Sequence, residues 1–232
     1  MTIATILAMG LCIKAGLWQY NKAESKKLLQ TQLNARLNEP AVALPDKIAN
    51  LKKEDLEAWR YKRVKLYGTY DTRYQVLLDN QVENTVAGYH VFTPLQVEGS
   101  KEYILVNRGW IAGRPDRSVP EVITPSGSQK IEGDISIPSS KFFTLEAPPL
   151  NQSAWQQVWQ NMDMQLYAKS VPFAVQPFVV RLDAKSKAGG FVRNWPPPGE
   201  RVSMHLGYAY QWFGFALTLL IIFIVLNVKK KI

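Results

Sequence analysis

The chain of 232 residues has few of the side chains that build covalent cross-links or metal centres. It contains one cysteine, Cys12, so it can form neither an intramolecular disulfide nor a cysteine-based metal site. Cys12 lies inside an apolar run, and we expect it to be a small buried hydrophobic residue. These shortages exclude domains that are held together by disulfides or by cysteine-ligated metal ions.

Sequence patterns of common enzyme classes are also missing. The chain has no nucleophile elbow, no phosphate-binding glycine loop and no HExxH motif. We expect His90 to be a structural residue of a strand, Asp163 to be a helix N-cap, and Arg108 to be a solvated or paired surface residue. We therefore predict no catalytic residue. An extracytoplasmic enzyme that uses His90 or Arg108 is kept as an alternative.

Acidic residues are in the minority, with 19 Asp and Glu against 28 Lys and Arg and a net charge of +9. The basic residues are spread along the chain rather than gathered in a stripe, and no nucleic-acid-binding motif is present, so we expect no nucleic-acid partner. Basic residues gather beside both apolar segments, and an anionic membrane surface explains the charge better. The mean hydropathy of −0.15 argues against a polytopic transporter, so membrane segments must be few.

The strongest membrane segment lies near the C-terminus. Residues 206–228 carry no formal charge, and a helix of this length spans about 35 Å, more than the hydrocarbon core of about 30 Å. Lysines follow it at 229–231, and aromatic residues crowd its other end. This pattern predicts a transmembrane helix at 204–228 with a cytoplasmic tail at 229–232.

An apolar run also opens the chain, from Ile3 to Trp18, with Lys14 able to extend towards the membrane interface. A cleaved signal peptide is the alternative, but no basic residue precedes the run and no clear small-x-small cleavage site follows it. We favour an uncleaved anchor at 1–18. Both helices then place the intervening residues, 19–203, on the outer side of the membrane.

The central region reads as a helix followed by strands. Residues 21–38 have leucines four residues apart and precede Pro40, and a second short helix is expected within 51–60. Short runs rich in Val, Ile, Tyr and Phe, separated by turn residues, predict strands. The predicted strands are 63–70, 74–82, 87–97, 101–111, 129–137 and 177–183, and a late helix is predicted at 163–170.

Most connections between these strands are too short for helical crossovers, so the sheet should be largely antiparallel. A compact, mainly β domain that resembles a partly closed barrel fits best. The predicted fold class is thus a membrane protein in which two transmembrane α-helices flank one mainly antiparallel, barrel-like α+β extramembrane domain.

His205 stands at the entrance to the final helix and shares one helical face with several large residues. These residues are Tyr208, Trp212, Phe215 and Ala216. A neutral imidazole at this depth could ligate haem iron while the aromatic rings pack on the macrocycle, and Arg201 could pair with a propionate. The alternative is an interfacial histidine that binds nothing, because His, Tyr and Trp all favour membrane interfaces.

Four stretches together resemble one known family. They are GLWQYNKAESKKLL, the pair GYHVFTPL and ILVNRGW, the pair PFVVRLD and FVRNWP, and HLGYAYQWFGFAL. On these motifs the sequence is similar to the bacterial form of the Surfeit-locus-one family of cytochrome oxidase assembly proteins.

The resemblance implies an assembly factor, not an enzyme, for haem–copper cytochrome c oxidase, and a role in inserting haem a into the catalytic subunit. It implies that His205 binds haem iron; with the helical spacing this gives a transient haem a site of His205, Tyr208, Trp212 and Arg201. The implied partners are oxidase subunit one and haem a synthase. The implied location is the bacterial inner membrane, with both termini cytoplasmic and the central domain periplasmic. A scaffold that stabilises oxidase subunits or haem a synthase without binding haem is the alternative.

Overall fold

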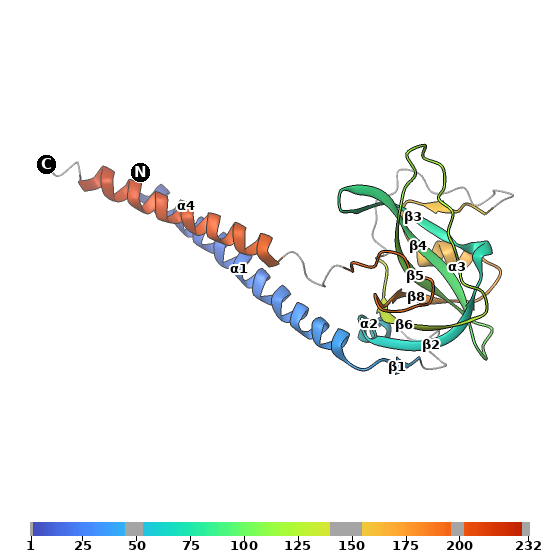
Figure 1. Ribbon diagram of the computed structural model, residues 1–232. Coiled ribbons are helices and arrows are strands. Elements are labelled where there is room, and N and C mark those ends of the chain that lie inside the picture. Colours follow the sequence, from blue (N-terminus) through green and yellow to red (C-terminus); the bar gives the residue numbers. More distant parts are fainter. Residues whose placement is uncertain (1, 45–52, 140–154, 196–201, 229–232) are drawn as a thin grey trace. The chain divides into compact units, whose positions relative to one another are not determined.

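A computed structural model describes residues 2–44, 53–139, 155–195 and 202–228 of the chain. The chain divides into two compact units (Figure 1). One unit consists of Met1–Ala35 and Pro196–Ile232, and the other is Arg36–Trp195. We refer to the first as the helical unit and to the second as the β domain.

The helical unit is built from α1 (Thr2–Asn38) and α4 (Val202–Val228). Both helices are long and apolar enough to cross a membrane, which confirms the predicted pair of flanking apolar helices. The sequence predicts a membrane segment at 1–18 and a separate helix at 21–38, whereas the structure has one uninterrupted helix. The reason is that no glycine or proline lies between Leu17 and Asn38. The membrane boundaries after residues 18 and 203 stay predictions.

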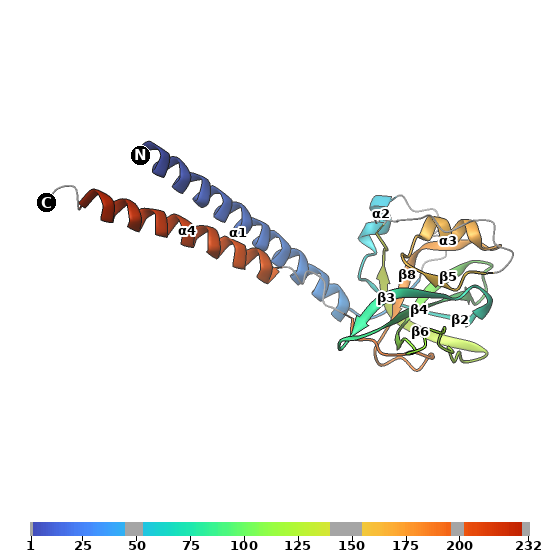
Figure 2. The same cartoon turned by 90° about the horizontal axis from the view of Figure 1, so that it is seen from above.

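The two helices lie side by side and antiparallel, so the start of α1 and the end of α4 are at the same end of the pair (Figures 1 and 2). Most of the buried residues of the two helices are small: Cys12, Gly16, Ala23, Ala209 and Ala216, with Leu33 as the large exception. A Cβ atom on Gly16 would lie 2.5 Å from Cε1 of Phe213. Small residues of this kind let helix backbones approach closely, which is the usual way that membrane helices associate.

Replacing Gly16 with leucine should therefore weaken the helix pair, because the new side chain meets the ring of Phe213. Overpacking of this kind costs about 1–3 kcal/mol, equivalent to a melting temperature lower by about 2–10 °C. The single thiol of Cys12, which is buried, reports melting through a thiol-reactive fluorophore on the purified protein in detergent. Gly10→Leu is the matched control, since no atom lies within 4 Å of its Cβ position. Equal melting temperatures for the two variants would contradict the close packing at Gly16.

In the described part of the β domain, eight strands form one sheet. The strands are β1 (Val42–Ala43), β2 (Arg63–Tyr70), β3 (Val76–Glu83), β4 (Val86–Val97), β5 (Tyr103–Ala112), β6 (Ser128–Ser136), β7 (Val158–Trp159) and β8 (Val175–Leu182). Their order is β1-β2-β6-β8-β5-β4-β3-β7, and β2 also pairs with β4. That extra pairing closes β2, β6, β8, β5 and β4 into a ring, so the barrel-like prediction is confirmed.

Most neighbouring strands are antiparallel, as predicted, and the parallel pairs are β1 with β2, β3 with β7, and β5 with β8. All six predicted strands are present. The additional strands β1 and β7 are two residues long each. So short a segment has no periodicity that could predict it.

The barrel interior is filled by the inward side chains of its strands. Alternate residues of β2, such as Val64 and Leu66, are buried together with Phe178 of β8. Leu56, from the short helix α2 (Lys53–Ala58), joins the same cluster. Burial of these apolar surfaces is the main force that holds the barrel together.

A second apolar cluster lies beneath α3 (Met164–Ser170), which packs on β8. Asp163 caps this helix, because its carboxylate accepts hydrogen bonds from the backbone N–H groups of Gln165 and Leu166 at 2.9 and 3.1 Å. The predicted N-cap is therefore confirmed. Tyr167 is fully buried here, and its hydroxyl donates to the carbonyl oxygen of Tyr74, at the end of the 3-10 turn η2 (Thr72–Tyr74), at 3.0 Å.

Candidate functional site

The histidine near the start of α4 is hydrogen-bonded to the other helix. Nδ1 of His205 lies 2.7 Å from Oε1 of Gln19, and both side chains are partly buried. An amide oxygen can only accept, so Nδ1 carries the hydrogen and donates it. In that tautomer the lone pair that can bind a metal ion is on Nε2.

Three aromatic residues follow His205 on the same helical face of α4: Tyr208, Trp212 and Phe215. Trp212 is half-buried, whereas 46% of the Tyr208 surface and 56% of the Phe215 surface are exposed. The rings of Trp212 and Phe215 meet edge to face, with centroids 5.9 Å apart. We call these three residues the aromatic flank. The predicted helical stripe thus runs along the edge of the helix interface, with Ala216 buried inside it.

Among the described residues, His205 and the aromatic flank match the needs of a haem better than those of a bare metal ion. Within residues 2–44, 53–139, 155–195 and 202–228, no three His, Cys, Asp or Glu side chains come close enough to hold a metal ion. A haem needs only an axial ligand from the protein, because its macrocycle supplies the remaining donors. One oriented imidazole beside an aromatic surface matches that requirement. Arg201, the fourth residue of the predicted site, lies outside the described residues.

The prediction for Arg108 of β5 was wrong. We expected a surface residue, but its side chain is fully buried. The guanidinium donates to the carbonyl oxygens of Gly189 (2.8 Å) and Ile123 (2.6 Å) and to the hydroxyls of Thr124 (2.7 Å) and Thr93 (3.3 Å). Those acceptors replace water, which is what makes burial of the charge tolerable. β5 is buried on both faces from Ile104 to Gly109. The prediction was wrong because it assumed that one face of this strand is exposed.

The same guanidinium lies between two aromatic rings, with Cζ 4.9 Å from the ring centroid of Tyr70 and 5.0 Å from that of Phe191. Burial lowers the pKa of Arg108 and raises the pKa of Tyr70 to about 12, so at neutral pH arginine is charged and tyrosine is not. Gly189 has a φ of +69°, and a Cβ atom there would come within 2.9 Å of Nη2 of Arg108. Arg108 therefore joins two connecting segments to the barrel and has a structural role.

Comparison with known proteins assigns the chain to one family. The SURF1 family model matches residues 6–217, a range that contains Gln19, Arg108 and His205. The chain belongs to the SURF1 family.

Individual relatives of this SURF1 family chain cover most of its length. A SURF1-like protein of Rickettsia felis is 24% identical over 228 residues, 96% of this chain and 95% of that protein. A SURF1-like protein of Caenorhabditis elegans is 26% identical over 235 residues, 90% of this chain and 68% of that protein. The cytochrome oxidase assembly protein SHY1 of Saccharomyces cerevisiae is 25% identical over 166 residues, 67% of this chain and 40% of that protein.

His90, the other histidine of this SURF1 family chain, is half-buried in β4. Its Nδ1 lies 3.4 Å from Nδ2 of Asn107, and its ring meets that of Trp195 edge to face with centroids 5.6 Å apart. Burial lowers the pKa of His90, so the ring is neutral at neutral pH. These contacts match the structural role that we expected for it.

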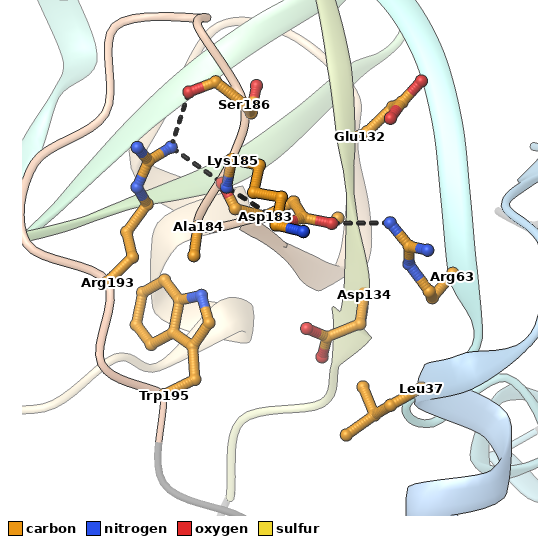
Figure 3. Close-up of a pocket in the computed structure, with 11 residues that line it drawn as sticks. Leu37, Arg63, Glu132, Asp134, Asp183, Ala184, Lys185, Ser186, Arg193 and Trp195 are labelled. Atoms are coloured by element: carbon orange, nitrogen blue, oxygen red, sulfur yellow. Dashed lines mark hydrogen bonds and ion pairs between the residues drawn. The ribbon is translucent and has the colours of Figure 1, made fainter.

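The β domain also carries a polar groove of about 570 Å³ that sequence reasoning did not predict (Figure 3). It is lined by Leu37, Arg63, Glu132, Gly133, Asp134, Asp183, Ala184, Lys185, Ser186, Arg193 and Trp195. Arg63 pairs with Asp183 at 2.5 Å, and Asp134 pairs with Arg181 at 2.7 Å. Arg193 donates to the carbonyl oxygens of Asp183 and Ser186 (Figure 3). The guanidinium groups of Arg63 and Arg193 are thus paired with acceptors of the β domain itself. We therefore assign these side chains a structural role.

Proposed function

We propose that this chain is a membrane-bound, non-enzymatic assembly factor for cytochrome oxidase. The observation that carries the proposal is membership of the SURF1 family, together with the similarity to a yeast protein named for cytochrome oxidase assembly. Two helices able to cross a membrane support a membrane location, where the subunits of such an oxidase also lie.

The finer part of the proposal is that the chain carries haem a on its way to the oxidase. His205 would supply an axial nitrogen through Nε2, and Tyr208 and Trp212 would cover one face or edge of the ring. The support is the oriented imidazole beside the aromatic flank. When bound, the haem supplies an iron centre with an open coordination position for such a ligand.

The packing of the helices favours a particular place for the ring. The ring of Phe213 packs against Gly16 and fills the space between α1 and α4 at that level, where a macrocycle would have to lie. The exposed side chains of Tyr208 and Phe215 instead offer an apolar surface on the outside of the pair. A ring held there by one axial ligand can be released to an acceptor without separating the helices.

The proposed partners are oxidase subunit one, as the acceptor of haem a, and haem a synthase, as its source. The proposed location is the bacterial inner membrane, with both termini cytoplasmic and the β domain periplasmic. The start of α1 and the end of α4 lie at the same end of the antiparallel pair (Figure 2), and this supports the proposal that both termini share one side of the membrane. The lysines at 229–231 in the sequence favour the cytoplasmic side.

Deleting the gene should lower the amount of haem a in the purified oxidase several-fold, because the proposed carrier no longer reaches subunit one. The measurement is the haem a content per oxidase, with the wild-type gene on a plasmid as the control that restores it. Normal amounts of fully loaded oxidase in the deletion strain would contradict an assembly role. Reduced oxidase that is restored equally by the wild type and by His205→Ala would favour the scaffold without haem.

A further inference from the structure

We propose that Gln19 is a positioning residue for His205. In this role the Gln19 side chain holds the imidazole in one tautomer and one orientation, so that Nε2 presents its lone pair to a ligand. The inference rests on the proposed haem-carrying function and adds to it a residue from the other helix. The two residues are 186 positions apart in the chain, and the antiparallel pairing of α1 and α4 is what brings them together.

The geometry supports a strong hydrogen bond. The distance from Nδ1 of His205 to Oε1 of Gln19 is 2.7 Å, short for a nitrogen donor. Both side chains are partly screened from the surroundings in the helix interface. A partly buried amide that lost this partner would have fewer water molecules to replace it, so the hydrogen bond is favoured over the open alternative.

The bond has the form of an outer-shell contact of a metal-binding histidine. Such histidines commonly donate their second ring N–H to a carbonyl or carboxylate oxygen, which fixes the tautomer and makes the ligating nitrogen more basic. Loss of the partner weakens metal binding about 10–100-fold in well-studied sites. Here the partner is a side chain, so it can be changed without altering the ligand.

The surrounding packing holds the two side chains within reach of each other. Gly16 lies one turn before Gln19 on α1, and Ala209 lies one turn after His205 on α4. Both are buried, and the absent side chain of Gly16 leaves room for the ring of Phe213 from α4. This packing of Phe213 on Gly16 joins the two helices about one to two turns from the contact between Gln19 and His205.

The test compares Gln19→Leu with Gln211→Leu. Gln211 is an exposed glutamine on α4, so its replacement makes the same chemical change away from His205. The full-length protein in mild detergent is titrated with haem a and followed by the Soret band. We expect the apparent affinity of Gln19→Leu to fall about 10–100-fold, that of Gln211→Leu to stay unchanged, and that of Gln19→Glu, which keeps an acceptor oxygen, to stay near the wild-type value.

A second readout needs no haem. The chain has two histidines, so ¹⁵N-histidine labelling gives a simple spectrum, in which a His90→Gln variant assigns the signals of His205. We expect His205 of the wild type to be the Nδ1-protonated tautomer, and the Gln19→Leu variant to shift towards the Nε2-protonated one. Thermal melting of each variant, followed by the reaction of the Cys12 thiol with the fluorophore, shows whether its helix pair is intact.

These two readouts separate the possible failures. A wild-type His205 protonated on Nε2 overturns the positioning role, and so does an unchanged tautomer together with unchanged haem affinity in Gln19→Leu. Absence of a Soret band in the wild type instead contradicts the proposed haem function. The positioning role of Gln19 then falls with it, even where the ¹⁵N spectrum shows His205 protonated on Nδ1.

Discussion

Replacing Arg108 with methionine should lower the free energy of unfolding of the β domain by about 3–5 kcal/mol, the range expected when a buried polar network loses its central member. The variant leaves the carbonyl oxygens of Gly189 and Ile123 and the hydroxyl of Thr124 without their donor. Each buried acceptor that loses its partner costs about 1–3 kcal/mol. The connecting segments that contain these residues should then separate from the barrel.

The measurement is thermal unfolding of the full-length protein in detergent, followed by tryptophan fluorescence. A loss of this size corresponds to a melting temperature lower by about 10 °C. Arg114→Met is the matched control, because Arg114 is exposed and its guanidinium donates only a long hydrogen bond, 3.4 Å, to the hydroxyl of Ser118. Arg108→Lys should also be strongly destabilised, since an ammonium group cannot reproduce the planar fork of the guanidinium. Equal melting temperatures for Arg108→Met and Arg114→Met would show that the network does not hold the domain together.

The second large effect is expected at the helix pair, where His205→Ala should remove almost all bound haem a. The substitution deletes the proposed axial ligand, and a ring left with only the aromatic flank has no bond to its iron. The expected decrease in haem affinity is about 100-fold or more, above the effect of an outer-shell residue. Haem content per protein after purification measures it. His90→Ala is the control, because His90 is the remaining histidine and lies in β4 of the β domain. Equal haem content in the two variants would show that His205 is not the ligand.

Local features of the β domain could be predicted because they depend on residues close together in the chain. The run from Arg63 to Tyr70 alternates between buried and exposed positions, and the structure has a strand over the same residues. Asp163 was recognisable as a cap from its position before a helical stretch, and its two backbone contacts confirm this.

Features that depend on distant residues could not be predicted in the same way. The pairing of β2 with β4 closes the barrel, but it joins strands whose contact depends on the bending of the whole sheet. Arg108 looks like a surface residue in the sequence, since a charged side chain is rarely buried without an acidic partner. Its acceptors are carbonyls and hydroxyls from segments that the fold brings to it.

In the helical unit, too, local features could be predicted from the sequence and a contact between distant residues could not. The apolar composition of α4 and the position of His205 at its start are visible in the sequence, and Tyr208, Trp212 and Phe215 of the predicted stripe all lie in α4. Gln19, in contrast, has no feature of its own in the sequence that marks it as a partner of His205. The contact requires the antiparallel register of two helices that lie at opposite ends of the chain.

The central claim, that this chain carries haem a through His205, is tested most directly by one absorption spectrum. The wild type and His205→Ala are each produced together with a haem a synthase and purified in mild detergent. We predict a Soret band in the wild type and its loss in the variant, with the β domain of both still folded. A band that persists unchanged in His205→Ala, or its absence from the wild type, would contradict the claim.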